Sequence, residues 1–193
     1  MTKEVYRIEN RSTLRACGVG DGPYRPEAEP SVAIQHVLSA MARRHVGHLH
    51  PSPRADGEPF DLYPEIAPSG WDENPDLFFG FENMYQLGSW YTDGELCMLG
   101  DLGYVISVYR VQPEDFFPGK SQVCFRHPVG GAPVSTMDPR SLLKQKTIDH
   151  ARSLIQHDLD THYNDPEVEN TYTWTDKGPV VKEGPDLRMG RAA

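Results

Sequence analysis

Several features that identify a secreted or membrane protein are missing from this sequence. Its three cysteines, Cys17, Cys97 and Cys124, are odd in number and widely spaced, and they form neither a CxxC pair nor a disulfide framework. Cys97 and Cys124 stand in apolar runs, where a free thiol behaves as a small buried hydrophobe. The first ten residues contain no apolar signal region, and no run approaches the roughly 20 apolar residues of a membrane span. We therefore expect a soluble cytoplasmic protein without membrane association.

Basic residues are also scarce. Lys and Arg number 19 against 28 Asp and Glu, which gives a formal net charge of −9 and a pI near 5.3. Non-specific affinity for nucleic acid comes mainly from Lys and Arg on phosphates, so direct nucleic-acid binding is not expected. An acidic surface either keeps a protein soluble or docks a basic partner, and the charge alone leaves both readings open.

The common catalytic signatures are absent as well. The chain has no GxSxG nucleophile motif, no Walker loop and no Rossmann fingerprint. The stretch from Gly18 to Gly22 is glycine-rich, but it does not follow a strand in the way that a phosphate-binding turn requires. The motifs alone therefore exclude the best-marked enzyme classes and assign none.

The length and composition predict a single α+β domain. A chain of 193 residues can bury a core without disulfides, and its 17 Pro and 17 Gly favour long ordered loops over a helical bundle. We expect a mixed, mostly antiparallel sheet with two or three packing helices. The domain is predicted to span 1–160, followed by a polar C-terminal extension, 161–193, that is partly disordered.

Periodicity and capping residues place the individual elements. They predict a strand over 4–9, a turn-rich connection over 10–21, a helix from Ser31 to about Gly47, a long surface loop over 51–76, helices over 84–91 and 92–102 with caps at Asn83 and at Thr92 or Asp93, a terminating Gly103, a strand over 104–111, a loop over 113–120, a strand over 121–125, a loop over 128–139 and an amphipathic helix over 141–157.

A histidine cluster raises the possibility of a metal site. His45, His48 and His50 form H-x2-H-x-H, but no cysteine joins them, and zinc needs three or four convergent ligands. The segment also lies at a predicted helix end, where histidine is favourable beside the negative end of the helix dipole. We favour this structural explanation and predict no metal.

Four short motifs carry a resemblance over roughly residues 5–126. They are YRIE at the first strand, a GPY turn, FGF before a helix, and QVCF in a later strand. In this order they resemble the ADP-ribosyltransferase-like fold. They are also similar to small uncharacterised proteins of bacteria and their phages.

This resemblance implies an NAD site with named residues. Arg7 would hold the ribose and phosphates of NAD, and Gln122 would stand near the third motif. The chain lacks the E-x-E or Q-x-E of the family, and an amide cannot supply the negative charge that stabilises a developing cation. Glu114, or its neighbour Asp115, would then have to serve as the acid. The residues expected to shape the nicotinamide pocket are Tyr24, Phe79, Phe81 and Tyr85.

A structural explanation of these residues, and with it a different function, remains open beside the NAD enzyme. Arg7 could lie on the solvent face of an edge strand, and the phenylalanines could simply belong to the core. The protein could then be a non-enzymatic, acidic interaction protein, for example a phage-type inhibitor whose partner is a host or defence complex. The net charge, the missing glutamate motif and the 51–76 segment favour that alternative.

Overall fold

The described part of the chain combines short antiparallel sheets with a few helices. The computed structural model describes residues 1–17, 20–23, 34–35, 38–39, 41, 44–45, 77–127, 131–162 and 170–183. The elements, in chain order, are β1 (Lys3–Asn10), α1 (Arg11–Cys17), β2 (Leu77–Gly80), α4 (Met84–Trp90), α5 (Asp93–Asp101), β3 (Tyr104–Val111), the 3₁₀ turn η4 (Pro113–Asp115), β4 (Phe116–Pro118), β5 (Val123–Arg126), β6 (Ser135–Met137), the 3₁₀ turn η5 (Pro139–Leu142), α6 (Gln145–His162), β7 (Asn170–Thr175) and β8 (Gly178–Glu183).

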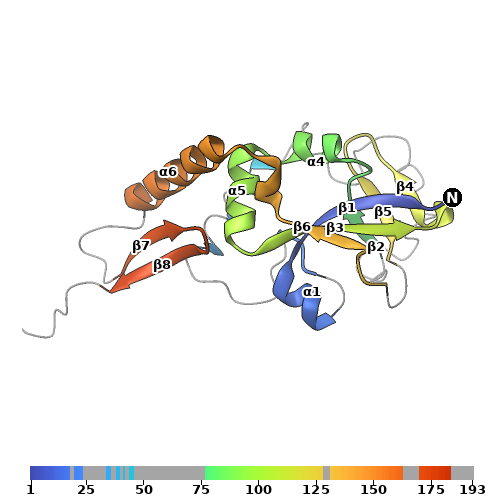
Figure 1. Ribbon diagram of the computed structural model, residues 1–193, viewed down its shortest axis with the longest axis horizontal. Helices are drawn as coiled ribbons and strands as arrows, with labels where there is room; N and C mark the ends of the chain where they lie inside the picture. Colours follow the sequence, from blue (N-terminus) through green and yellow to red (C-terminus); the bar gives the residue numbers. More distant parts are fainter. Residues whose placement is uncertain are drawn as a thin grey trace, which may run out of the picture.

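Two three-stranded sheets form the centre of the molecule. Their strand orders are β1-β3-β6 and β2-β5-β4, and every ladder between the described strands is antiparallel. A bridge between Tyr6 and Phe81 joins β1 to the end of β2, with reciprocal backbone hydrogen bonds of 2.8 and 2.7 Å. Gly80 permits this approach, because a Cβ there would lie 2.6 Å from a methyl carbon of Val5. The bridge joins the two sheets along strand edges at the centre of the molecule (Figure 1), and side chains of both sheets, among them Tyr109 and Phe125, pack in one core cluster between them.

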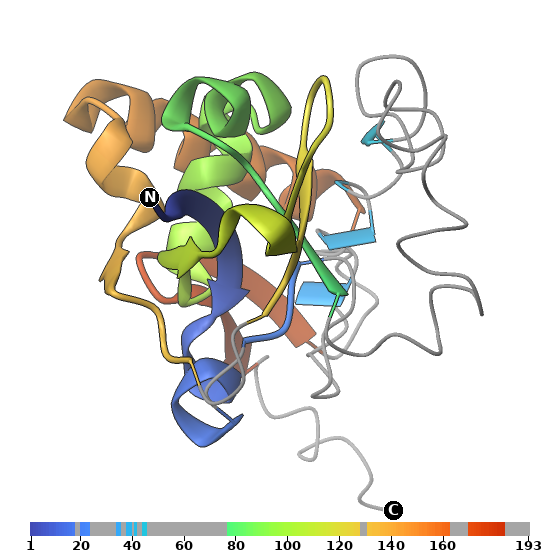
Figure 2. The ribbon, with the colours of Figure 1, turned by 90° about the vertical axis from the view of Figure 1, so that its right-hand side faces the viewer.

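Strand β3 is the most deeply buried element of the sheets. Every residue from Tyr104 to Tyr109 is buried, because the strand is covered on both faces. Tyr104 and Ile106 face the main core with α4 and α5, whereas Tyr109 and Val111 pack with Phe125 between the sheets. A continuous apolar run suits a strand of this kind better than simple alternation does. Helix α1 lies on the side of this sheet away from α4 and α5 (Figures 1 and 2).

The predicted caps of α4 and α5 are confirmed. The Asn83 side chain accepts a hydrogen bond from the backbone N–H of Gln86 at the start of α4. Thr92 and Glu95 form a reciprocal capping box at the start of α5. Gly103 follows α5 with a φ of +83°, a left-handed conformation that favours glycine. These signals act within a single turn, so the sequence alone reveals them.

Several sequence predictions need correction. The connection over 10–21 contains α1, whose first turn is capped by the Asn10 side chain accepting from Ser12 N–H. The predicted loops over 113–120 and 128–139 contain β4 and β6, and the last helix begins at Gln145 because a 3₁₀ turn occupies Pro139–Leu142. Three-residue strands have no readable periodicity and depend on their pairing partners. The strand predicted over 121–125 lies at Val123–Arg126.

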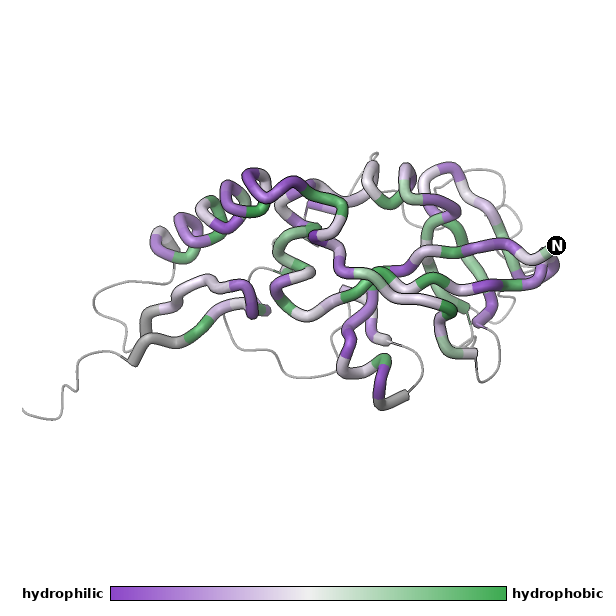
Figure 3. The backbone as a smooth tube through the Cα atoms, viewed as in Figure 1, coloured by the Kyte–Doolittle hydropathy of each residue, from purple (hydrophilic) through white to green (hydrophobic). Residues whose placement is uncertain are grey.

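The C-terminal range contains more structure than the sequence analysis anticipated. Strands β7 and β8 form an antiparallel hairpin, and Trp174 on β7 belongs to the main core. The hairpin packs beside α6, whose polar and apolar residues alternate turn by turn (Figure 3). The domain boundary at residue 160 stays a prediction. The Ser31 cap and the 51–76 segment lie outside the described residues.

Among the described residues, no helix combines the length and the apolar character needed to cross a membrane. The fold as a whole is a single α+β domain with antiparallel sheets and few helices.

Candidate functional site

The sequence-predicted anchor, Arg7, lies inside the space between the two sheets. Its Nε donates to Oε1 of Glu9 at 2.7 Å, its Nη1 to the carbonyl of Phe79 at 2.9 Å, and its Nη2 to the carbonyl of Gly20 at 3.3 Å. The guanidinium also lies 4.8 Å from the centre of the Phe78 ring. Only 13% of the Arg7 side chain is exposed, so the alternative of a solvent-facing arginine is wrong.

Glu9 is the acceptor at the centre of this cluster, and its side chain is fully buried. Its second oxygen, Oε2, accepts a hydrogen bond of 2.7 Å from the Tyr109 hydroxyl. Burial, and after it the charge of Glu9, raises the pKa of Tyr109 far above its ordinary value. The His127 ring packs against Tyr109 with their centroids 5.0 Å apart. Arg7 and Glu9 thus neutralise each other, and the phenol keeps its proton.

The expected acid does not approach Arg7. The β1–β3 register pairs Arg7 with Ser107 and Lys3 with Val111, so Val111 lies about 13 Å from the position opposite Arg7 at ~3.3 Å per residue. Glu114 follows Val111 on the turn η4, where it is exposed. Glu114 therefore follows the end of β3 and does not lie opposite Arg7.

The remaining predicted site residues are also dispersed. Phe81 packs with Trp90 in the main core, on the other side of the β1–β3 sheet from Arg7. Tyr85 projects from α4 with 84% of its surface exposed, and Gln122 is buried just before β5. Phe79 meets Arg7 through its backbone carbonyl. Tyr24 lies outside the described residues.

A second polar cluster surrounds His45, the one described member of the predicted metal triplet. Its Nε2 lies 3.1 Å from Oε1 of Glu95, and its ring packs against Trp90 and Tyr91. No group of three or more metal-type side chains converges within the part of the chain that the structure describes. His48 and His50 lie outside that part.

Glu95 connects this cluster to the start of α5. Burial by itself raises the pKa of Glu95, but hydrogen bonds from His45 and Thr92 outweigh burial and lower that pKa to about 2. The Thr92 hydroxyl donates to Oε2 of Glu95 at 3.0 Å, while His45 meets Oε1. The carboxylate thus stands between the hydroxyl and the imidazole. In a nucleophilic triad the imidazole must contact the hydroxyl directly, so this arrangement stabilises the helix start instead.

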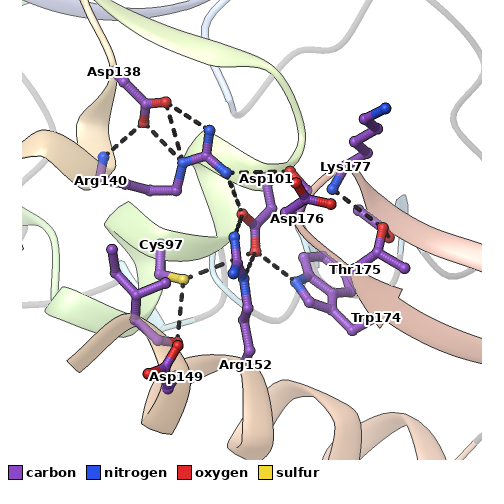
Figure 4. Close-up of polar contacts among 12 residues, drawn as sticks. Cys97, Asp101, Asp138, Arg140, Asp149, Arg152, Trp174, Thr175, Asp176 and Lys177 are labelled. Carbon is purple, nitrogen blue, oxygen red and sulfur yellow. Dashed lines mark hydrogen bonds and ion pairs between the residues drawn. The ribbon is translucent and has the colours of Figure 1, made fainter. Parts of the chain in front are cut away.

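The third cluster centres on Asp101 at the end of α5 (Figure 4). Arg152 on α6 donates to both carboxylate oxygens, at 2.9 and 2.7 Å. Arg140 on η5 donates to Oδ1 at 2.7 Å, and the Trp174 indole N–H donates to Oδ2 at 2.9 Å. Arg140 is held in turn by Asp138, and that hydrogen bond raises the pKa of Arg140. One fully buried carboxylate therefore joins four segments of the chain.

Cys97 lies beside Asp101, one helical turn earlier. Its Sγ is 3.8 Å from the Asp101 carboxylate and 3.7 Å from the carbonyl of Ile148 on α6. Burial, followed by the charge of Asp101, raises the pKa of Cys97 to about 11. A thiol with so high a pKa is a poor nucleophile near neutral pH.

Sequence reasoning missed the three carboxylates at the centres of these clusters. Glu95 had a readable signal, because a Glu three residues after Thr92 completes a capping box. Glu9 stands two residues after Arg7 on the first strand, and this spacing places both side chains on the same face of the sheet. Asp101 had no local signal, since its partners are 39 to 73 residues away.

Comparison with known proteins adds a family. No curated protein and no solved structure matches the chain, so the ADP-ribosyltransferase-like resemblance stays a prediction. The family model for the bacteriophage T4 Y00F protein matches residues 1–137, which include both central sheets and α5. Because this match covers more than two thirds of the sequence, the chain belongs to the bacteriophage T4 Y00F protein family.

Proposed function

We propose that this phage-family protein acts by binding a basic surface of a protein partner, such as a host or defence complex. The observation that carries the proposal is the position of the negative charge along the chain. Segment 51–76 contains seven Asp or Glu residues and a single Arg, and so holds −6 of the net −9. A concentrated charge of this kind steers a partner of opposite sign and selects against partners of like sign.

The polar clusters of the described part support a binding role over catalysis. Arg7 is engaged by Glu9 and by two backbone carbonyls, so holding a phosphate would require breaking those hydrogen bonds. Glu114 lies beyond the end of β3, away from Arg7. Buried polar groups that satisfy one another stabilise a scaffold, and a scaffold can present a charged segment.

Salt dependence tests this proposal directly. The tagged protein is used to capture partners from bacterial extract at 0.1 M and 0.5 M salt, and each captured protein is then purified. The Debye length falls from about 10 Å at 0.1 M toward 3 Å at 1 M, so an interaction through charge weakens as salt rises. We expect a purified partner to bind at least about tenfold more weakly at the higher salt. Salt-independent binding would contradict the proposal.

Two charge variants separate the segment from the net charge. Each removes four negative charges and so changes the formal net charge from −9 to −5. The test variant replaces four acids of the segment, namely D56N, E58Q, D61N and E65Q. The control variant replaces four exposed acids of the described part, namely E114Q, D149N, D158N and D160N. We expect only the test variant to lose the partner. If both variants lost partner binding equally, total charge and not the segment would be responsible.

The NAD hypothesis is tested with the same purified protein. A ligand that binds only the folded state stabilises it by about 2.7 kcal/mol at one hundred times its dissociation constant. Under the binding proposal, NAD and ADP-ribose leave the melting temperature unchanged. A rise with either ligand that disappears in R7A would instead support a dinucleotide site at Arg7.

A further inference from the structure

The segment beyond the family match forms a distinct unit at one end of the molecule. We name η5, α6, β7 and β8 the C-terminal unit; its described residues are 138–162 and 170–183. The match to the family model ends at residue 137. The unit lies at the end opposite the N-terminus, with α5 between it and the two central sheets (Figure 1).

Hydrogen bonds hold the unit together internally. The Gln156 side chain on α6 accepts from the backbone N–H of Trp174 at 2.6 Å and donates to the carbonyl of Tyr172 at 3.2 Å. Strands β7 and β8 pair with each other, and neither pairs with a described strand of the central sheets. Helix and hairpin are therefore joined to each other by hydrogen bonds between the Gln156 side chain and the β7 backbone, and the hydrogen bonds of Asp101 join them to α5.

Side chains of the C-terminal unit meet α5 at a polar contact on Asp101 and an apolar contact on Cys97, and further side chains of the unit reach the main core. Asp101 receives Arg140, Arg152 and Trp174, all from the C-terminal unit. Next to it, Ile148 and Ala151 of α6 pack over Cys97. Leu159 and Trp174 add apolar contacts with the main core. Asp101 is thus the one described residue of α5 that binds all three polar groups.

Because the contact at Asp101 is made by charged groups, it should weaken when either the carboxylate or one of its arginines is removed. Two partly exposed arginines compensate the fully buried carboxylate of Asp101, so removing either arginine leaves that buried charge with less compensation. Such a loss is far more unfavourable than losing an exposed ion pair. Gly100 allows the close approach of η5, since a Cβ there would lie 2.7 Å from Cγ of Arg140.

We propose that the C-terminal unit opens from α5 as one body, without unfolding of the central sheets, and that Asp101 holds it closed. Proteins open locally in cooperative, roughly contiguous units that often coincide with supersecondary motifs, as the α6–hairpin unit does here. Opening separates Asp101 from its three donors and uncovers the α5 face around Cys97. The unit is therefore a hinged cover on the family fold.

The alkylation rates of the two described thiols, Cys97 and Cys124, distinguish local opening from global unfolding. Cys97 lies under α6, whereas Cys124 is buried on β5 in the central sheets. Local opening exposes Cys97 alone, and global unfolding exposes both. A C17S parent leaves only these two thiols, and mass spectrometry of alkylated peptides measures each rate.

Two substitutions distinguish opening from a change in thiol ionisation. Asp101 raises the pKa of Cys97, while Arg152 lowers it. Electrostatics alone would therefore speed alkylation in D101N and slow it in R152Q. We expect both variants to speed alkylation of Cys97, by roughly a hundredfold, with Cys124 unchanged. The control E9Q removes an equally buried carboxylate from the central sheets and should leave the rate at Cys97 as in the parent.

Slower alkylation in R152Q, or equal acceleration of both thiols in D101N, would overturn the proposal. Should the variants fail to fold, the parent itself gives the answer in urea below its unfolding transition. Local opening exposes less surface than global unfolding and so depends less steeply on urea. We expect this shallow dependence for Cys97 and a steep one for Cys124. Identical dependences would show that no separate unit opens.

Discussion

Tyr109 donates its hydroxyl hydrogen to the buried carboxylate of Glu9 at 2.7 Å, although the two residues are 100 positions apart in the chain. The antiparallel register of β1 and β3 brings them together, since both side chains face the space between the two sheets. Glu9 also accepts from Arg7, so its two oxygens are both engaged. The carboxylate can remain charged inside the fold because Arg7 supplies the opposite charge and Tyr109 a second hydrogen bond.

Removing the Tyr109 hydroxyl should destabilise the protein. Y109F keeps the ring but deprives a buried carboxylate of a donor, and hydrogen bonds to charged groups contribute about 1.5–3 kcal/mol. We expect a loss of this size in the free energy of unfolding measured with urea. The control is Y85F, because Tyr85 is 84% exposed and its change should stay within ~0.5 kcal/mol. Equal effects in the two variants would contradict the role of the buried cluster.

Acid should destabilise the protein through Glu95. Its pKa is lowered from 4.5 to about 2 in the folded state, so its contribution is present above pH 4.5. That contribution is lost as the pH falls from 4.5 toward 2, because the unfolded state then binds the proton more tightly. A shift of this size corresponds to about 3 kcal/mol at neutral pH.

The measurement is the free energy of unfolding between pH 6 and pH 2.5, in the wild type and in E95Q. We expect the difference between the two to shrink as the pH falls through that range. E114Q, at an exposed acid, serves as the control and should follow the wild type. A pH-independent difference between the wild type and E95Q would show that the carboxylate charge does not matter.

Two glycine substitutions should have opposite effects. G100A places a Cβ 2.7 Å from Cγ of Arg140 and 2.9 Å from Oδ1 of Asp138, so these side chains must shift. Overpacking of this kind costs about 1–3 kcal/mol. G88A on α4 meets no atom within 4 Å, and alanine favours a helix over glycine by about 0.5–1 kcal/mol. Thermal melting should therefore fall for G100A and rise for G88A; a matching fall in both would contradict the assigned contact.

The predictable part of this protein lies in its local signals. The apolar run over 104–111 predicts β3 with its observed bounds, and alternation over 4–9 predicts β1 to within a residue at each end. Asn83, Thr92 and Gly103 mark the helix ends where the structure has them. These signals succeed because side-chain periodicity and capping act over a few residues.

Only the tertiary structure decided which polar groups work together. The sequence marked Arg7 as a candidate anchor, but the register of β1 and β3 assigned it to Glu9 and separated it from Glu114. The H-x2-H-x-H spacing groups His45 with the neighbouring histidines, whereas in the folded protein His45 contacts Glu95.

Asp101 had no local signal, because its donors are 39 to 73 residues away in the chain. The β7–β8 hairpin is different, since its paired residues are at most 13 positions apart and its strands were a local pattern that the sequence prediction missed. A buried charge is stable only where the fold gathers its donors, and that gathering depends on contacts between residues far apart in sequence. Periodicity and capping therefore determined the elements of this protein, and long-range packing determined its polar centres.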